Sequence, residues 1–191
     1  MKWRRGLLFK IKTENYLLYP LTPENLSDDM MGWFRDPEVM KYFVMPMDTD
    51  REQLCQILRT FNNDHRYWLG IDDRKSGQKV GFFLIYCNYL HKQVRTGICI
   101  GDKQYWGKRC VQEVRASVLK FVFTQMKMHK VFGDVDVRNF PSIFNYKSQG
   151  FRCEGILRKE RLGQDGVWHD HFRFAILHDE WLQQRTESSV D

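Results

Sequence analysis

The sequence lacks long apolar runs, internal repeats and low-complexity linkers. No window approaches about 18 consecutive apolar residues, the length that a membrane-spanning helix needs, so we expect no membrane association. The apolar run at residues 7–9 is interrupted by Lys10 and is shorter than the ~7–15 residues of an export signal, so we expect a cytoplasmic protein. Without a repeat or a linker, the 191 residues predict a single domain over residues 1–191, in which residues 1–14 could form a basic amino-terminal extension.

Paired cysteines and metal-ligand spacings are also missing. The five cysteines are an odd number, none is spaced as Cys-x-x-Cys, and most stand in apolar runs, as reduced buried thiols do. Cys99 has no base near it in the sequence, so we do not expect it to carry an acyl group. His169 and His171 would share one face of a strand, but no third ligand is apparent, and the sequence predicts no metal site.

The charge is unbalanced, with a formal net value of +6. A field of this sign attracts anions, and nucleic acid, an acidic membrane or a polyphosphate cofactor would all be compatible with it. The basic residues are spread along the chain apart from an amino-terminal group, and no recognition motif accompanies them. We therefore interpret the charge as a solvated basic surface and expect no nucleic-acid partner.

Apolar periodicity predicts early helices, then a run of strands, then strands alternating with helices. Helices are expected to begin at Thr22, Asp36 and Thr49, the last through a Thr-x-x-Glu capping box. Expected strands cover residues 16–21, 67–71, 80–87, 94–101, 131–137, 151–161 and 167–177, and two later helices cover residues 111–122 and 142–148. This order predicts an α/β fold with one mixed central sheet and helices on both faces.

Two segments carry the chemistry. Residues 98–108 run from an apolar strand through a short polar turn into a helix that begins near Arg109. A helix start leaves backbone N–H groups unpaired with a partial positive charge behind them, which is how a protein can hold a phosphate. Residues 139–142 (Asn-Phe-Pro-Ser) follow later, with Tyr146 and then residues 150–151 (Gly-Phe). Together the segments resemble the GNAT superfamily of N-acetyltransferases, in particular its ribosomal-protein-alanine acetyltransferase-like branch.

The resemblance implies a single-domain GNAT-like fold over essentially the whole chain. It implies acetyl-CoA as the acetyl donor, a primary amine as the acceptor and direct attack in a ternary complex without a metal, in a monomer or a homodimer. Tyr146 would donate a proton to the leaving sulfur, and Asn139 would contact the cofactor arm. The other cofactor-binding residues would be Ile98, Cys99 and Ile100 beside the pantetheine, Trp106, Gly107, Lys108, Arg109, Cys110 and Val111 around the pyrophosphate, and Ser142.

The pyrophosphate loop departs from the family pattern Gln/Arg-x-x-Gly-x-Gly/Ala. Its two small positions fall on Arg109 and Val111, and alignment from Gln104 recovers Gly107 but still leaves Arg109 in place of a small residue. A small residue there lets the phosphate approach the backbone closely. Two functions follow from this difference. Either the helix amides still hold the cofactor of an N-acetyltransferase, or the chain is a non-catalytic acyl-CoA-binding or interaction module with a degenerate loop.

Several of these residues also have structural interpretations. Tyr146 could be a core tyrosine, since buried Tyr hydroxyls usually find structural partners, and Asn139 could be a turn residue or helix cap. Asp134, Asp136 and Glu154 are candidates for the general base, but acidic residues on an exposed strand face explain the two aspartates equally well. The sequence does not identify the base.

Three kinds of amine are open as the acceptor. A protein amino terminus follows from the branch resemblance, and a nucleotide-linked amino sugar suits the positive field because it carries a diphosphate. A polyamine suits it least, because like charges repel. Residues 63–68 contain side chains that could stack on a sugar or base, or they are simply the end of a helix followed by a strand.

Overall fold

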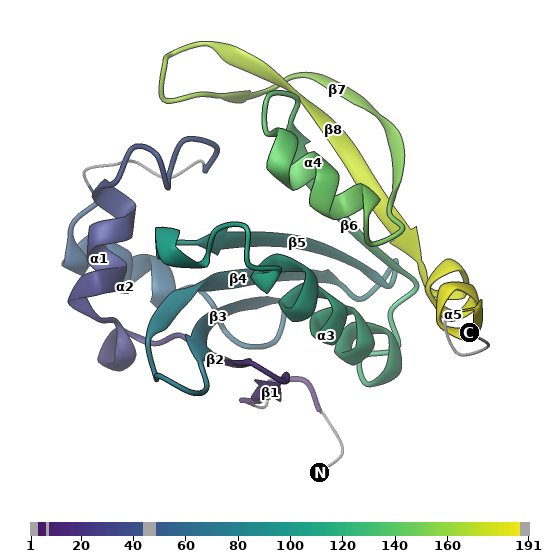
Figure 1. Cartoon of the computed structure of the whole chain (residues 1–191), viewed down its shortest axis with the longest axis horizontal. Coiled ribbons are helices and arrows are strands. Elements are labelled where there is room, and N and C mark those ends of the chain that lie inside the picture. Colours follow the sequence, from purple (N-terminus) through teal and green to yellow (C-terminus); the bar gives the residue numbers. More distant parts are fainter. Residues whose placement is uncertain (1–3, 7, 44–48, 188–191) are drawn as a thin grey trace.

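One mixed sheet forms the centre of the computed structural model, which describes residues 4–6, 8–43 and 49–187 (Figure 1). Its eight described strands run in the order β1-β2-β3-β4-β5-β6-β8-β7. All neighbours pair antiparallel except β5 and β6. The strands are β1 (Ile11–Lys12), β2 (Tyr16–Pro20), β3 (Arg66–Asp73), β4 (Lys79–Asn88), β5 (Gln93–Ile100), β6 (Lys130–Asp136), β7 (Arg152–Leu162) and β8 (Trp168–Leu177).

The β5–β6 pair divides the sheet into two parts. The two strands pair only from Gln93–Arg95 to Lys130–Phe132, although β5 continues to Ile100 and β6 to Asp136. Figure 1 shows the group β6–β8–β7 turning away from the group β1–β5 beyond this short contact. The separated ends of β5 and β6 therefore each have an edge that no neighbouring strand of the described chain covers.

Helices cover both faces, as the sequence predicts. α1 (Asp28–Arg35) and α2 (Arg51–Arg59) pack their apolar sides on one face, where Phe82 and Leu84 lie in the same core cluster. α3 (Cys110–Thr124) packs on the other face, where Phe83 and Ile85 belong to a second cluster. Successive side chains of a strand point to opposite faces, so β4 supplies both cores. The remaining helices are α4 (Phe140–Lys147) and α5 (His178–Glu187), which both contribute to the cluster around α3.

The helix starts in the first third of the chain differ from the predictions. Thr22 precedes only a 3₁₀ turn (Pro23–Asn25), and Ser27 caps α1 instead. The expected helix at Asp36 is a turn. The capping box of α2 lies one residue later than expected, from Asp50 to Gln53. The shifts of the first and third starts have one cause, because adjacent Ser, Thr and Asp residues are equivalent in a pattern and only the backbone conformation selects the one that caps.

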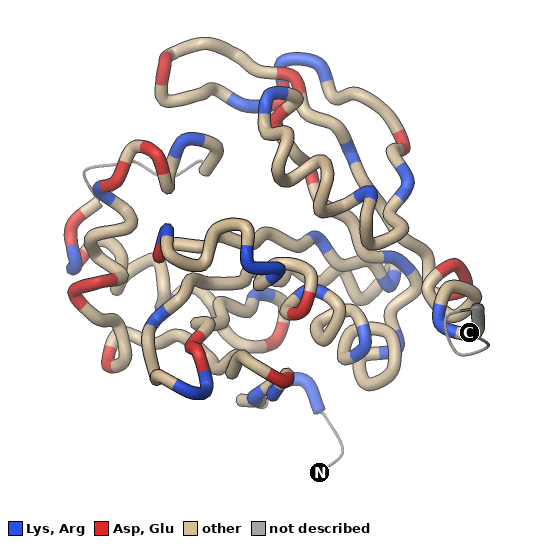
Figure 2. Tube along the Cα trace, viewed as in Figure 1, with Lys and Arg blue, Asp and Glu red and all other residues tan. Residues whose placement is uncertain are grey.

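The two ends of the chain add elements that the pattern did not indicate. β1 lies within residues 1–14, the possible basic extension, and pairs with β2. Residues 1–3 and 7 of that stretch lie outside the described part. At the other end, α5 follows β8. Figure 2 shows the basic residues distributed over many elements of the fold. Within the described residues, no helix has the length and apolar character needed to cross a bilayer.

Candidate functional site

A cavity of about 1270 Å³ opens where β5 and β6 separate. It exceeds the roughly 300–1,000 Å³ typical of small-molecule sites and has room for more than one ligand. Its walls come from β5, the start of α3, the end of β6, α4 and the segment after α1. All the predicted site residues except Lys108 lie along it: Ile98, Cys99, Ile100, Trp106, Gly107, Arg109, Cys110, Val111, Asn139, Ser142 and Tyr146.

Free amides at the start of α3 make one end of this cavity attractive to anions. The first intrahelical hydrogen bond runs from Glu113 N to Arg109 O at 3.1 Å. Among the described residues, no protein acceptor is found for the N–H groups of Cys110, Val111 and Gln112. Unpaired amides together with the helix dipole can bind a phosphate directly.

Arg109 explains why the loop pattern calls for a small residue. It precedes α3 in the left-handed conformation, with φ of 60°, and Gly107 also has a positive φ of 75°. This conformation costs a residue with a Cβ roughly 1–2 kcal/mol, which glycine avoids. Arg109 is exposed and Val111 is half-buried. Arg109 thus adopts the left-handed conformation despite this cost, and the amides at the start of α3 still have no protein acceptor among the described residues.

β5 contributes an unpaired strand edge and a buried thiol, that of Cys99. Burial raises the pKa of the Cys99 thiol to about 12, so it is not ionised near neutral pH. Its side chain belongs to the core cluster of α1 and α2. The indole of Trp106 donates to the carbonyl of Ile100 at 2.9 Å and covers the end of the strand, while remaining 42% exposed.

The hydroxyl of Tyr146 lies at the point where β5 and β6 part. The ring is buried, stacked on Phe174 with centroids 5.5 Å apart, and the guanidinium of Arg115 lies 3.9 Å from its centre. A Cβ added at Gly133 of β6 would overlap the hydroxyl oxygen and lie 3.2 Å from the carbonyl oxygen of Thr96 on β5. Within the described chain, this hydroxyl has no hydrogen-bond partner. The ring thus has the structural role of a core residue, while the polar atom stays free beside the cavity.

The structure gives Asn139 a capping role. Its side-chain oxygen accepts from Ser142 N at 3.2 Å and starts α4. The turn after α4 is tied to α3, because the Gln149 side chain donates to the carbonyl of Gln112 at 2.9 Å. Asn139 and Ser142 both face the cavity, so a contact with cofactor is compatible with the cap.

The candidate bases are all held in ion pairs. Arg173 binds Asp134 through two hydrogen bonds of 2.8 and 3.1 Å. Arg138 does the same to Asp136 at 2.9 and 2.7 Å. Burial alone would raise the pKa of Asp136, but the hydrogen bonds from Arg138 outweigh it and lower the pKa overall.

Glu154 is held in the same way by Lys130 at 2.6 Å. Each of the three candidates is therefore already engaged by a cationic side chain, and Glu154 does not line the cavity.

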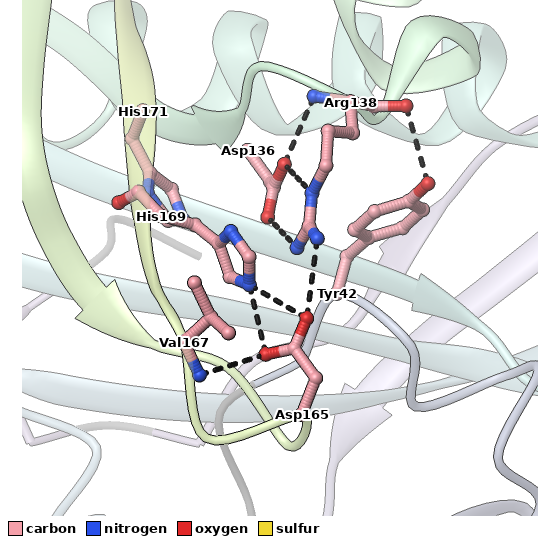
Figure 3. Close-up of polar contacts among 7 residues, drawn as sticks. All are labelled: Tyr42, Asp136, Arg138, Asp165, Val167, His169 and His171. Atoms are coloured by element: carbon pink, nitrogen blue, oxygen red, sulfur yellow. Dashed lines mark hydrogen bonds and ion pairs between the residues drawn. The ribbon is translucent and has the colours of Figure 1, made fainter.

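Figure 3 shows a polar network that joins three segments at the mouth of the cleft. Arg138 links Asp136 to Asp165 in the turn between β7 and β8, and His169 contacts the same Asp165 at 2.8 Å. The hydroxyl of Tyr42, in the segment after α1, donates to the carbonyl of Arg138 at 3.1 Å. His169 is therefore used structurally, and the described residues hold no group of three or more His, Cys, Asp or Glu side chains suited to a metal ion.

Sequence reasoning missed three arginines that line the cavity, Arg95, Arg115 and Arg161. Arg115 is 1% exposed and lines the cavity, with its Nε atom unpaired. Arg115 lies four residues from both Val111 and Leu119, so it shares the apolar face of α3 with them. This spacing could have predicted that the side chain is buried. Of residues 63–68, Arg66 lines the cavity, whereas Tyr67 and Trp68 are buried in the cores.

Comparisons with known proteins agree with this geometry. The model of the family described as Acetyltransferase (GNAT) domain matches residues 15–152. Probable N-acetyltransferase YjcK of Bacillus subtilis (strain 168) is 31% identical over 138 residues, which cover 69% of this chain and 72% of that protein.

Two solved structures are similar in fold. Spermidine N-acetyltransferase from Vibrio cholerae, in complex with CoA and spermine, has a TM-score of 0.79 at 21% identity, over 88% of this chain and 98% of that one. Ribosomal-protein-S5-alanine acetyltransferase from Vibrio fischeri has a TM-score of 0.77 at 16% identity, over 91% of this chain and 98% of that one. Because the two proteins are named for different acceptors, the shared fold does not select an acceptor.

Proposed function

The chain belongs to the GNAT family of acetyltransferases and is an acetyl-CoA-dependent N-acetyltransferase, and we propose that it acetylates a primary amine by direct attack in a ternary complex. One observation carries the proposal. The free amides of α3 and the free hydroxyl of Tyr146 line the same cavity, at the place where the sheet opens.

The cofactor would lie along the α3 side of this opening. Its pyrophosphate would accept from the amides of Cys110, Val111 and Gln112, and its pantetheine would pair with the free edge of β5 as another strand does. The edge begins after Arg95, where pairing with β6 ends. This path would bring the thioester toward the separation of the two strands.

Tyr146 would act as the general acid. The departing thiolate has a solution pKa near ~8.5 and the phenol one near ~10, so a proton shared between them lowers the barrier to leaving. The absence of a protein partner for the hydroxyl, within the described residues, supports this role over a purely structural one. A protein amino terminus or a nucleotide-linked amino sugar would be the acceptor. We also propose that the chain belongs to the ribosomal-protein-alanine acetyltransferase-like branch of the family.

The first test is binding and turnover with the intact chain. Acetyl-CoA should raise the melting temperature, because it binds only the folded state. A panel of amines analysed by mass should then yield a product heavier by one acetyl group. No thermal shift at saturating acetyl-CoA would contradict the cofactor site, and binding without any acetylated amine would favour a non-catalytic acyl-CoA-binding module.

The second test concerns Tyr146. Tyr146→Phe should lower kcat by about 10²–10⁴-fold, the usual contribution of a general acid, with little change in the affinity for acetyl-CoA. Tyr67→Phe is a matched control, because Tyr67 is fully buried in the core and does not line the cavity. Unchanged kcat in Tyr146→Phe would remove the general-acid role.

A further inference from the structure

A row of basic side chains crosses the face of the sheet opposite α3. Arg66 on β3 is directly opposite Tyr86 on β4, and Tyr86 is directly opposite Arg95 on β5. Directly paired residues share a face, and this face is the one covered by α1 and α2, because Leu84 is two residues from Tyr86 on the same strand. All three side chains line the cavity. The guanidinium of Arg95 lies 4.6 Å from the ring centre of Tyr86, which holds its plane in place.

Arg161 approaches the same place from the far part of the sheet. It lies on β7, its side chain is 28% exposed, and it also lines the cavity. Burial lowers the pKa of its guanidinium, and the nearby charge of Arg95 lowers it further. Burial raises the pKa of Tyr86, while the charges of Arg95, Arg66 and Arg161 all act in the opposite direction. Arg66 and Arg95 therefore flank Tyr86 through strand pairing, and Arg161 lines the same cavity from β7.

The carboxylates of the cavity do not neutralise this cluster. Asp134 binds Arg173 through two hydrogen bonds, and Arg161 is only at the 4.0 Å limit of an ion pair with it. Asp136 and Glu38 are paired with Arg138 and Lys103. In the described part of the chain, Arg66 and Arg95 have no carboxylate within ion-pair distance. Arg95 and Arg161 are partly buried, and within the described residues Arg161 has only one distant counter-charge, which is unfavourable for both cations. An anion supplied by a ligand would relieve that cost.

We propose that the acceptor amine carries a phosphate group and that Arg66, Arg95 and Arg161 bind it. The inference rests on the proposed function and adds the chemical class of the acceptor. The cavity then has two anion sites on opposite faces of the sheet. The α3 amides hold the cofactor on one face, and the arginines hold the acceptor on the other. The amine and the thioester meet where β5 and β6 part. A polyamine, which is cationic along its length, lacks a group for this cluster.

The test uses small probes and the protein saturated with CoA, so that the α3 amides are already occupied. 2-Aminoethyl phosphate, ethanolamine and spermidine are titrated by calorimetry. 2-Aminoethyl phosphate should bind at least about tenfold more tightly than ethanolamine, the effect of one or two charge-assisted hydrogen bonds. Inorganic phosphate should compete with it, and added salt should weaken its binding.

Substitutions locate the site. Arg66→Ala, Arg95→Ala and Arg161→Ala should each weaken 2-aminoethyl phosphate by about tenfold while leaving ethanolamine and CoA unaffected. Arg66→Ala is the variant expected to disturb folding least, because Arg66 is exposed. Arg95→Lys keeps the positive charge and should retain part of the affinity for 2-aminoethyl phosphate. Arg152→Ala is the matched control, because this arginine also lies on β7 but is 77% exposed and pairs with Glu180 outside the cavity.

The outcomes separate the two proposals. Failure of CoA to bind would contradict the proposed function. The phosphate proposal alone is overturned if CoA binds but 2-aminoethyl phosphate binds no better than ethanolamine. A calorimetric titration that detects binding of neither ligand counts as the same result. It is also overturned if spermidine binds more tightly than 2-aminoethyl phosphate, or if the arginine substitutions weaken ethanolamine and 2-aminoethyl phosphate equally.

Discussion

Gly133→Ala should displace the hydroxyl of Tyr146 and so test the position from which the general acid is expected to act. A Cβ at residue 133 would overlap the hydroxyl oxygen and lie 2.8 Å from Cζ of the ring. The ring cannot easily retreat, because Phe174 stacks on one face and Arg115 lies 3.9 Å from its centre. The alanine itself is compatible with the strand, since Gly133 has no positive φ.

The magnitude follows from two opposing effects. Overpacking a tight site typically costs about 1–3 kcal/mol. Alanine in place of glycine inside a strand returns roughly 0.5–1 kcal/mol through the entropy of the unfolded chain. The net expectation is a loss of about 1–2 kcal/mol in the free energy of unfolding, which for a chain of this length lowers the melting temperature by about 2–8 °C.

The assay is a double-mutant cycle read by urea unfolding and by kcat. Tyr146→Phe removes the overlapping oxygen, so Gly133→Ala should be less destabilising in that background, with a coupling of about 0.5–2 kcal/mol. Gly97→Ala on β5 is the matched control for stability, because its Cβ would meet Leu84 at an ordinary 3.9 Å. In the otherwise unchanged protein, kcat of Gly133→Ala should fall toward that of Tyr146→Phe.

The reasoning would be refuted by additive behaviour. If Gly133→Ala and Gly97→Ala have the same effect on stability, and Tyr146→Phe does not change the cost of the former, the hydroxyl does not occupy the space above Gly133. A normal kcat in Gly133→Ala would remove the link between that position and proton donation.

Three further predictions concern the loop, the pH range and the thiols. Arg109→Gly should raise the free energy of unfolding by up to about 1 kcal/mol in urea, because glycine adopts the left-handed conformation without strain, whereas Arg109→Ala should not. The hydrogen bond from His169 holds the pKa of Asp165 at about 2, below its unfolded value near ~3.9. This stabilisation is present above the unfolded pKa and is lost as the pH falls toward 2, so the melting temperature should decline less between pH 4 and pH 2 in Asp165→Asn. Mass mapping after brief alkylation should find Cys153, which is exposed, modified well before the buried Cys99; equal rates would contradict the described burial.

The regular elements were predictable because their patterns are local. The strands around residues 67–101 and the helix that contains Val114 and Val118 follow from period-two and helical spacing, and the structure confirms them within a few residues. Helix starts were less predictable, since Thr22 and Thr49 compete with neighbouring residues as caps. α5 was missed because its sequence is mostly polar and it depends on packing of Trp181 against Phe123.

The site divides in the same way. Sequence alone determined the strand, the turn and the helix start whose amides are free at the beginning of α3. These residues are consecutive in the chain, and unpaired amides are a property of any helix start. Only the tertiary structure decided that β5 parts from β6 after Arg95, that the hydroxyl of Tyr146 lies over Gly133, and that Arg66 and Arg161 line one cavity. Those arrangements depend on strand order and register between distant segments. A one-residue change in register would turn each of those strand side chains to the opposite face of the sheet.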